Sequence, residues 1–195
     1  MKALRAEFYD RPVVEAARDL IGCIVERGDT AGVIVETEAY HESEPACHAY
    51  IGLTPRTSTL FGEPGVAYVY QSYGIHALLN AVCESEGVGA AVLIRALEPV
   101  KGIELMRARR RVSDDRELCS GPGKLTQALG IDLVQNGSDL HSGPVRIRAR
   151  AHGWRDPAVV VGRRIGISKA VELSWRFCVA GNVHVSRPRP AAAPA

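Results

Sequence analysis

A candidate reactive site begins in the stretch from Val33 to Tyr40, which reads V-I-V-E-T-E-A-Y. Its first three residues are β-branched and lack helical spacing, so they predict a buried strand. Side chains alternate between the two faces of a strand, and Glu36, Glu38 and Tyr40 should therefore project to the same side. Two interpretations fit: a site that sets carboxylates beside an aromatic ring, or the rim of a sheet with two solvated glutamates.

Arg95 is a second residue of interest, because it lies inside another apolar run, Ala90 to Leu97. An arginine within a buried strand must find a partner, since an unpaired buried charge is very costly. Glu38 is the candidate carboxylate. We therefore expect an ion pair between these two residues.

A third candidate, His48, lies in the irregular segment from His41 to Gly65. This segment is long for a connection inside a compact domain, and loops of that length are commonly functional. A lone histidine in a loop is, however, more often a surface or capping residue than a catalytic one. The sequence leaves both roles open.

Three tyrosines follow in and after a predicted strand, Ala67–Tyr70. Tyr68 and Tyr70 should share one face of it. Tyr73 precedes Gly74 at the tip of a turn, where a ring can either fold back onto the domain or be held out from the surface as a wedge. Sequence alone favours folding back.

The rest of the chain predicts the elements that position these residues. Helices are expected at Asp10–Gly22, Glu98–Arg111 and Ser120–Gly130. Strands are expected at Ile21–Glu26, in a hairpin with the Val33 strand, and at Val145–Arg150, Ala158–Val161, Arg163–Ile167, Trp175–Val179 and Asn182–Ser186. The start of the helix at Ser120 could hold a phosphate oxygen or be plainly capped.

These elements predict a single mixed α/β (α+β) domain over residues 1–186, largely an antiparallel β-sheet with flanking helices. The sequence from Ser186 onward, S-R-P-R-P-A-A-A-P-A, lacks anything to bury, and residues 187–195 should form a disordered tail. We see no internal repeat and no domain boundary.

Composition is that of an ordinary globular protein, with 46% hydrophobic and 24% charged residues and a net charge of +2. The 20 arginines outnumber the 4 lysines, and several cluster at Arg107–Arg111, Arg146–Arg150 and Arg163–Arg164. These clusters predict a basic face suited to phosphate, although the codon bias of a GC-rich genome is an equal explanation.

The five cysteines are scattered and never in C-x-x-C spacing, which predicts neither a disulfide framework nor a zinc site. No apolar run is long enough for a membrane span, and no signal-peptide core follows Met1. We expect a soluble cytoplasmic protein, associated with the nucleoid if it is bacterial.

The order of several motifs resembles that of the alkyladenine (3-methyladenine, methylpurine) DNA glycosylases. The motifs are E-T-E-A-Y, C-H-A-Y with T-P-R, F-G-x-P-G-x-A-Y-V-Y-x-x-Y-G, L-I-R-A-L-E-P and L-C-S-G-P-G-K-L-T-Q-A-L-G-I. The similarity runs from about Ala16 to Ile131 and continues more loosely to about Ser186, through R-I-G-I-S and W-R-F-C-V.

The resemblance implies a role for each candidate residue. Glu38 matches the general base that activates a water, and Arg95 matches the residue that helps to hold it. The base-binding positions correspond to Tyr40 on one face of a flipped base, His48 and Tyr70 on the other face, Tyr68 orienting the histidine, and Asn80 crowding the amino group of guanine. Tyr73 matches the side chain that intercalates into the duplex.

By this resemblance the protein is a monofunctional DNA glycosylase of base excision repair, acting as a monomer on double-stranded DNA with damaged purines. It needs no metal or cofactor, since a carboxylate beside a water supplies general-base catalysis and the alkylated or protonated base is the leaving group. The lysine of a Schiff-base lyase is absent. A non-catalytic lesion-binding protein and a nucleosidase of similar fold are the alternatives.

Three positions depart from the family pattern. Thr57 follows T-P-R where the family often has Asn. His41 stands where an apolar residue is common, and Ile75-His76 replaces a bulkier tip. The last two bear on substrate preference and on the strength of the wedge, not on the reaction.

Overall fold

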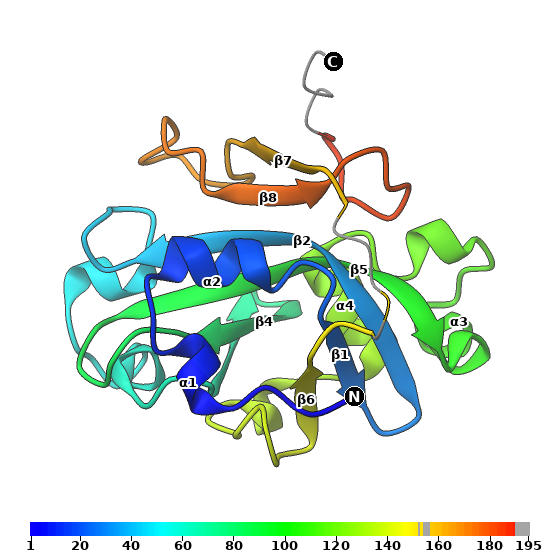
Figure 1. Ribbon diagram of the computed structural model, residues 1–195, viewed down its shortest axis with the longest axis horizontal. Coiled ribbons are helices and arrows are strands. Elements are labelled where there is room, and N and C mark those ends of the chain that lie inside the picture. Colours follow the sequence, from blue (N-terminus) through cyan, green and yellow to red (C-terminus); the bar gives the residue numbers. More distant parts are fainter. Residues whose placement is uncertain (152, 154–156, 190–195) are drawn as a thin grey trace.

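One antiparallel sheet forms the centre of the protein in the computed structural model, which describes residues 1–151, 153 and 157–189 (Figure 1). Its strands are β1 (Ile24–Arg27), β2 (Thr30–His41), β3 (Ala67–Ser72), β4 (His76–Val82), β5 (Ala90–Lys101), β6 (Val145–Arg148), β7 (Val159–Gly162) and β8 (Arg176–Val179). Along the main path the order is β3-β4-β5-β2-β1-β6, while β8 joins β2 and carries β7. The predicted fold class, a single domain of mixed helices and antiparallel strands, is confirmed.

Short helices flank this sheet. They are α1 (Ala6–Tyr9), α2 (Val13–Asp19), α3 (Ile103–Arg110) and α4 (Pro122–Leu129), with 3-10 turns at η1 (His48–Ile51), η2 (Ser58–Phe61), η3 (Asp115–Glu117) and η4 (Leu133–Gln135). α2 begins directly after Pro12 and turns Val13, Ala16 and Ala17 into the core. α2 packs on β2 and β5, whereas α4 packs on β4 and β5. Within the described residues, no helix is long and apolar enough to cross a membrane.

β2 and β5 are the longest strands and run side by side through the middle of the molecule (Figure 1). Their register shifts around Arg95, which has no direct partner on β2. Such a β-bulge bends the strand and re-aims a side chain. On its other edge β2 pairs first with β1 and then, from Glu36 to Glu38, with β8. The carboxylate-bearing part of β2 is therefore enclosed between β5 and β8.

A small apolar cluster fastens the long loop between β2 and β3 to the sheet. Cys47 and Ala49, on either side of His48, are buried in it together with Leu60 of η2 and Tyr68 of β3. The two buried neighbours hold His48 over the sheet. All five cysteines are buried and free.

The predicted helix from Glu98 to Arg111 is partly wrong. β5 continues through Glu98 and Pro99 to Lys101, because these residues pair with the first part of β2. The helix begins only at Ile103, after Gly102 in a left-handed conformation (φ 73°). Tertiary pairing thus outweighs a local sequence signal that is typical of a helix start.

Two predicted strands near the C-terminus, Arg163–Ile167 and Asn182–Ser186, are also wrong, because both segments are irregular. Their polar groups bond to the centre of the sheet instead. Ser186 is buried and bonds to Glu36, so the segment that begins there does bury a residue. Of the expected tail, residues 190–195 lie outside the described part of the chain.

Candidate active site

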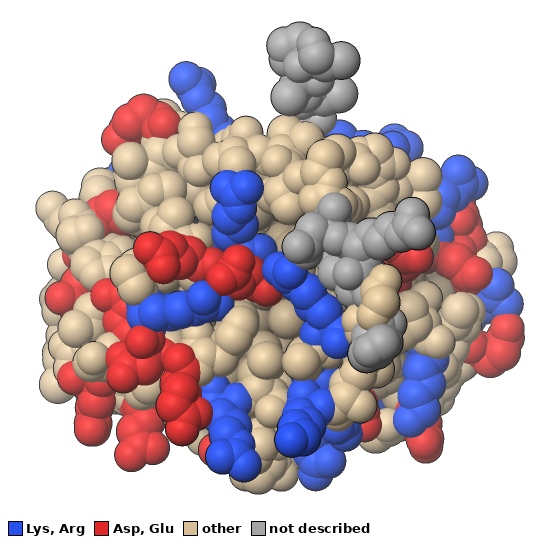
Figure 2. Space-filling model, in the orientation of Figure 1, with Lys and Arg blue, Asp and Glu red and all other residues tan. Residues whose placement is uncertain are grey.

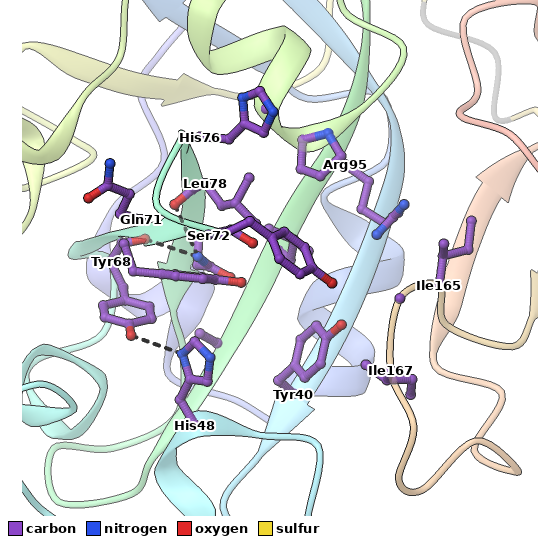
Figure 3. A pocket seen from close by; sticks show the side chains of 18 of the residues that line it. Tyr40, His48, Tyr68, Gln71, Ser72, His76, Leu78, Arg95, Ile165 and Ile167 are labelled. Atoms are coloured by element: carbon purple, nitrogen blue, oxygen red, sulfur yellow. Dashed lines mark hydrogen bonds between the residues drawn. The ribbon is translucent and has the colours of Figure 1, made fainter.

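A pocket of about 680 Å³ lies beside β2, β5 and the β3–β4 hairpin (Figure 3). Its wall also includes part of η1, the loop at residues 165–167 and the start of α4. Most of the candidate residues come together in this wall: Tyr40, His48, Tyr68, Tyr70, Tyr73, Asn80 and Arg95. Glu38 lies behind the wall, where it contacts Tyr40 and Arg95.

Three rings form one side of the pocket. The centroids of Tyr68 and Tyr70 are 5.3 Å apart with an interplanar angle of 25°, and His48 stands edge-on to Tyr70 at 4.6 Å. The Nδ1 atom of His48 is 3.1 Å from the Tyr68 hydroxyl, so this tyrosine orients the imidazole. Burial, and then the charge of Arg56, lowers the pKa of His48, which leaves the ring neutral at neutral pH. Tyr40 lies across from His48 and Tyr68 (Figure 3).

Glu36 and Glu38 are both fully buried, so the interpretation of this stretch as a solvated sheet rim is wrong. Arg95 reaches both carboxylates: its Nε atom is 2.8 Å from Glu36 and its Nη1 atom 3.1 Å from Glu38. The expected ion pair between Glu38 and Arg95 is confirmed, with Glu36 as a second partner. The bulge at Arg95 places one guanidinium between two carboxylates of the facing strand.

Three hydrogen bonds orient the Glu38 carboxylate. One oxygen accepts from the Tyr40 hydroxyl (2.8 Å) and from Arg95, and the other accepts from the backbone N–H of Ile165 (2.7 Å). Burial raises the pKa of Glu38 above its ordinary value, although Arg95, Ile165 and Tyr40 oppose the shift. A raised pKa makes the ionised Glu38 carboxylate a stronger base than an ordinary carboxylate.

Glu36 has the same side-chain chemistry in a different setting. It accepts hydrogen bonds from Arg95, from Arg176 Nε (2.8 Å) and from both the backbone and the hydroxyl of Ser186. Burial raises the pKa of Glu36, but Arg95, Arg176 and Ser186 outweigh it and hold the pKa below its ordinary value. Glu36 therefore stays charged and fully bonded, and does not share the elevated basicity of Glu38.

Tyr73 lies at the tip of the β3–β4 hairpin. Its side chain extends into solvent, with 88% of the residue exposed. Tyr73 (φ 51°) and Gly74 (φ 71°) both have positive φ, as in the tight turns that match the twist of a hairpin. The expectation that this ring folds back onto the domain is wrong, and the turn holds it at the edge of the pocket.

Asn80 is buried in β4, directly opposite Tyr68 of β3. Its Nδ2 atom donates to the carbonyl oxygen of Tyr68 at 3.0 Å. This bond fixes the amide while its side chain still lines the pocket. The residue therefore combines a local structural bond with a position where it can touch a bound molecule.

Comparison with known proteins identifies the family. Residues 7–183 match the family model described as methylpurine-DNA glycosylase. The chain belongs to the methylpurine-DNA glycosylase family. It is 53% identical to a protein of Bradyrhizobium diazoefficiens over 97% of this chain and 93% of the relative, and 49% identical to one of Methanoculleus marisnigri over 94% and 98%. Both relatives carry the name "Putative 3-methyladenine DNA glycosylase". The protein is thus a DNA glycosylase.

Arginines of this glycosylase are used in more than one way. Arg164 is buried and pairs with Glu44, and Arg148 pairs with Glu26, so these two members of the predicted clusters bond within the fold. Figure 2 shows Lys and Arg interspersed with Asp and Glu on the face that carries α1 and α2. Arg56 and Lys124 are cations of the pocket wall itself.

The departures from the family pattern occupy different places in the glycosylase. The hydroxyl of Thr57 closes its turn by bonding to Thr54 and to the carbonyl of Gly52. His41 bonds to Ser43 and is not part of the pocket wall. Ile75 is largely exposed at the hairpin tip beside Tyr73.

Sequence reasoning missed several groups around Glu38. The N–H of Ile165 is a backbone donor, and no side-chain type announces it; the loosely matching motif R-I-G-I-S was the only signal. Ser186 and Arg176 were not recognised as partners of Glu36, because they come from distant parts of the chain. Within the described residues, no cluster of three or more His, Cys, Asp and Glu is placed to hold a metal ion.

Proposed function

We propose that the glycosylase flips damaged purines out of duplex DNA into this pocket and hydrolyses their N-glycosidic bond as a monofunctional enzyme. The observation that carries the proposal is the buried Glu38 carboxylate, held by Arg95 behind the wall of an aromatic pocket. Alkylated purines are the main substrates, and ethenoadenine and hypoxanthine are further candidates. The names of the two relatives point to 3-methyladenine.

The flipped base stacks between Tyr40 on one side and His48 with Tyr70 on the other. A pocket of about 680 Å³ is within the usual range for a small ligand. Stacking contributes about 1–3 kcal/mol per base and tolerates different ring substituents, which suits several lesions. Damaged bases also cost less to unstack than intact ones.

Glu38 acts as the general base. It accepts a proton from a water that attacks the sugar carbon, and Arg95 helps to hold this water. The departing purine carries the electron pair of the broken bond, which is favourable when the base is alkylated or protonated. The elevated pKa of Glu38 brings its basicity closer to neutral pH than that of an ordinary carboxylate.

Two alternative functions predict different activities. A lesion-binding protein without activity would not need the buried Glu38 carboxylate that bonds to Arg95. A nucleosidase acting on free nucleosides would have no use for Tyr73, which lies exposed at the pocket edge. Comparing purine release from lesion-containing duplex with release from the free nucleoside separates these alternatives.

The proposal is tested with Glu38→Gln, which keeps size and hydrogen bonding but removes the proton acceptor. Release of 3-methyladenine from methylated duplex under single-turnover conditions should fall by about 100- to 10,000-fold, while lesion binding persists. Glu26→Gln, which changes a glutamate paired with Arg148 away from the pocket, is the matched control and should keep its rate. EDTA should not affect the wild-type rate, and borohydride should trap no adduct. Near-normal turnover by Glu38→Gln would mean that another residue is the general base.

A further inference from the structure

Arg164 lies against the Tyr40 ring. The Cζ atom of its guanidinium is 4.6 Å from the centroid of Tyr40 and 5.3 Å from that of Trp175. Its side chain is fully buried and does not contribute to the pocket wall, whereas Tyr40 does. The guanidinium of Arg164 therefore packs against the Tyr40 ring from the side away from the pocket.

Hydrogen bonds fix this guanidinium to three segments. Its Nη1 atom donates to the Ala39 carbonyl (2.9 Å) and to Glu44 (2.6 Å), and its Nη2 atom donates to the Ala170 carbonyl (3.4 Å). Its Nε atom is buried and has no hydrogen-bond partner among the described residues. A buried donor is normally bonded. The planar group thus gives up one hydrogen bond while it remains stacked against aromatic faces.

The neighbour of Arg164 in sequence is Ile165, whose backbone N–H donates to Glu38 at 2.7 Å. Arg164 is bonded to the Ala39 carbonyl on β2 and to the Ala170 carbonyl in the following loop. These two bonds set the position of the backbone at Ile165 relative to Glu38. Tyr40, the other group that Arg164 contacts, donates its hydroxyl to the same carboxylate. Two of the three donors to Glu38 therefore belong to residues that contact or directly follow this arginine.

We propose that Arg164 is a positioning residue, which holds the Tyr40 ring and the Ile165 N–H in place around the Glu38 carboxylate. This inference rests on the proposed roles of Glu38 as base and Tyr40 as stacking platform. Arginine suits the task because its planar fork can stack and bond to several acceptors at once, which an ammonium cannot do. The same residue looks like part of a basic surface in the sequence.

The test compares the pH dependence of single-turnover release of 3-methyladenine from methylated duplex. The substrate base is already cationic, so the acidic limb reports groups of the enzyme. Arg164→Met should lower the rate at the optimum by about 10- to 100-fold through loss of alignment. Because the Ile165 N–H stabilises the ionised form of Glu38, its loss should move the acidic limb to higher pH by about one unit or more. Arg164→Lys should restore little of either property.

Two further variants separate positioning from folding. Arg164→Met leaves Glu44 buried without its partner, whereas the double variant Glu44→Gln/Arg164→Met removes both charges and should fold while showing the same shift of the limb. Arg148→Met removes an ion pair to Glu26 away from the pocket and should keep the wild-type profile. A folded double variant with a wild-type rate and limb would overturn the inference. If Glu38→Gln remains active, the proposed function fails instead.

Discussion

Two glutamates separated by one residue have opposite electrostatic settings in this glycosylase. The carboxylate of Glu36 is held charged by two arginines and Ser186, and the pKa of Glu38 is raised by burial with a single arginine beside it. Divergent settings of this kind separate structural from reactive carboxylates. The sequence predicts that both project to one side, but not which of them has the raised pKa, because Arg176 and Ser186 arrive from the far end of the chain.

Asn80 provides a test of selectivity at the scale of one residue. Its amide should meet the position where guanine carries an amino group and hypoxanthine carries hydrogen. Exclusion by contact and by unmet hydrogen bonds can discriminate by about 1–3 kcal/mol, or roughly 5- to 150-fold. Asn80→Ser should therefore raise the release of guanine relative to hypoxanthine by a factor in this range, measured on duplexes carrying each base.

The alternative role of Asn80 is purely structural, through its bond to the Tyr68 carbonyl. In that case Asn80→Ser would lower the melting temperature and would reduce the rate of base release equally for all substrates. The variant is therefore measured for both properties. An unchanged ratio of guanine to hypoxanthine release, together with a lowered melting temperature, would rule out the selectivity role.

At the scale of elements, the β3–β4 hairpin carries pocket rings on its strands and Tyr73 at its tip. The strands and turn were predictable, because alternating apolar residues and the Tyr73-Gly74 pair are local signals. The bulge at Arg95 and the path of the loop at Ile165 were not, because they depend on which strands meet across the sheet. The predicted strand at Arg163–Ile167 failed because the backbone N–H of Ile165 bonds to the Glu38 side chain instead of to a neighbouring strand.

The hairpin tip predicts a difference between duplex and single-stranded substrates. Tyr73→Ala should reduce excision of a paired lesion by about 10-fold or more, since unstacking costs a few kcal/mol and we propose that the ring fills the gap left by the flipped base. The same lesion in single-stranded DNA leaves no gap, and its excision should change little. Single-turnover rates on the two substrates measure this difference.

Val161→Ala is a suitable control for this variant, because Val161 is exposed on β7 outside the pocket wall. It should leave both rates as they are. Equal losses on duplex and single strand after Tyr73→Ala would mean that the ring has a structural role.

At the scale of the whole molecule, net charge says little about where DNA binds. The net charge is only +2, and the two signs are interspersed on the face in Figure 2. Arg164 and Arg148 are bonded within the fold. The sequence could not predict this, because buried and exposed arginines have the same pattern in a sequence. Of the two pocket cations, Lys124 pairs with Glu117, so Arg56 is the better candidate for a phosphate contact.

Affinity for lesion-containing duplex should fall steeply with added salt, because each neutralised phosphate releases counterions. Arg56 is exposed and belongs to the pocket wall, so Arg56→Gln should reduce the slope of log affinity against log salt by about one. Arg18→Gln, on an exposed position of α2, is the matched control and should leave the slope unchanged. A flat salt response of the wild type would remove phosphate contacts from the binding mechanism.

Ser186, which hydrogen-bonds to Glu36 and Arg95, comes late in the chain. Ser186 leaves the ribosome after every strand of the sheet. Until it docks, Glu36 lacks two of its donors and Arg95 lacks one acceptor. The β3–β4 hairpin and its rings lie wholly before Ser186 in the chain. The strands that carry the pocket rings are therefore translated before Ser186, which completes the hydrogen bonds around Glu36 and Arg95.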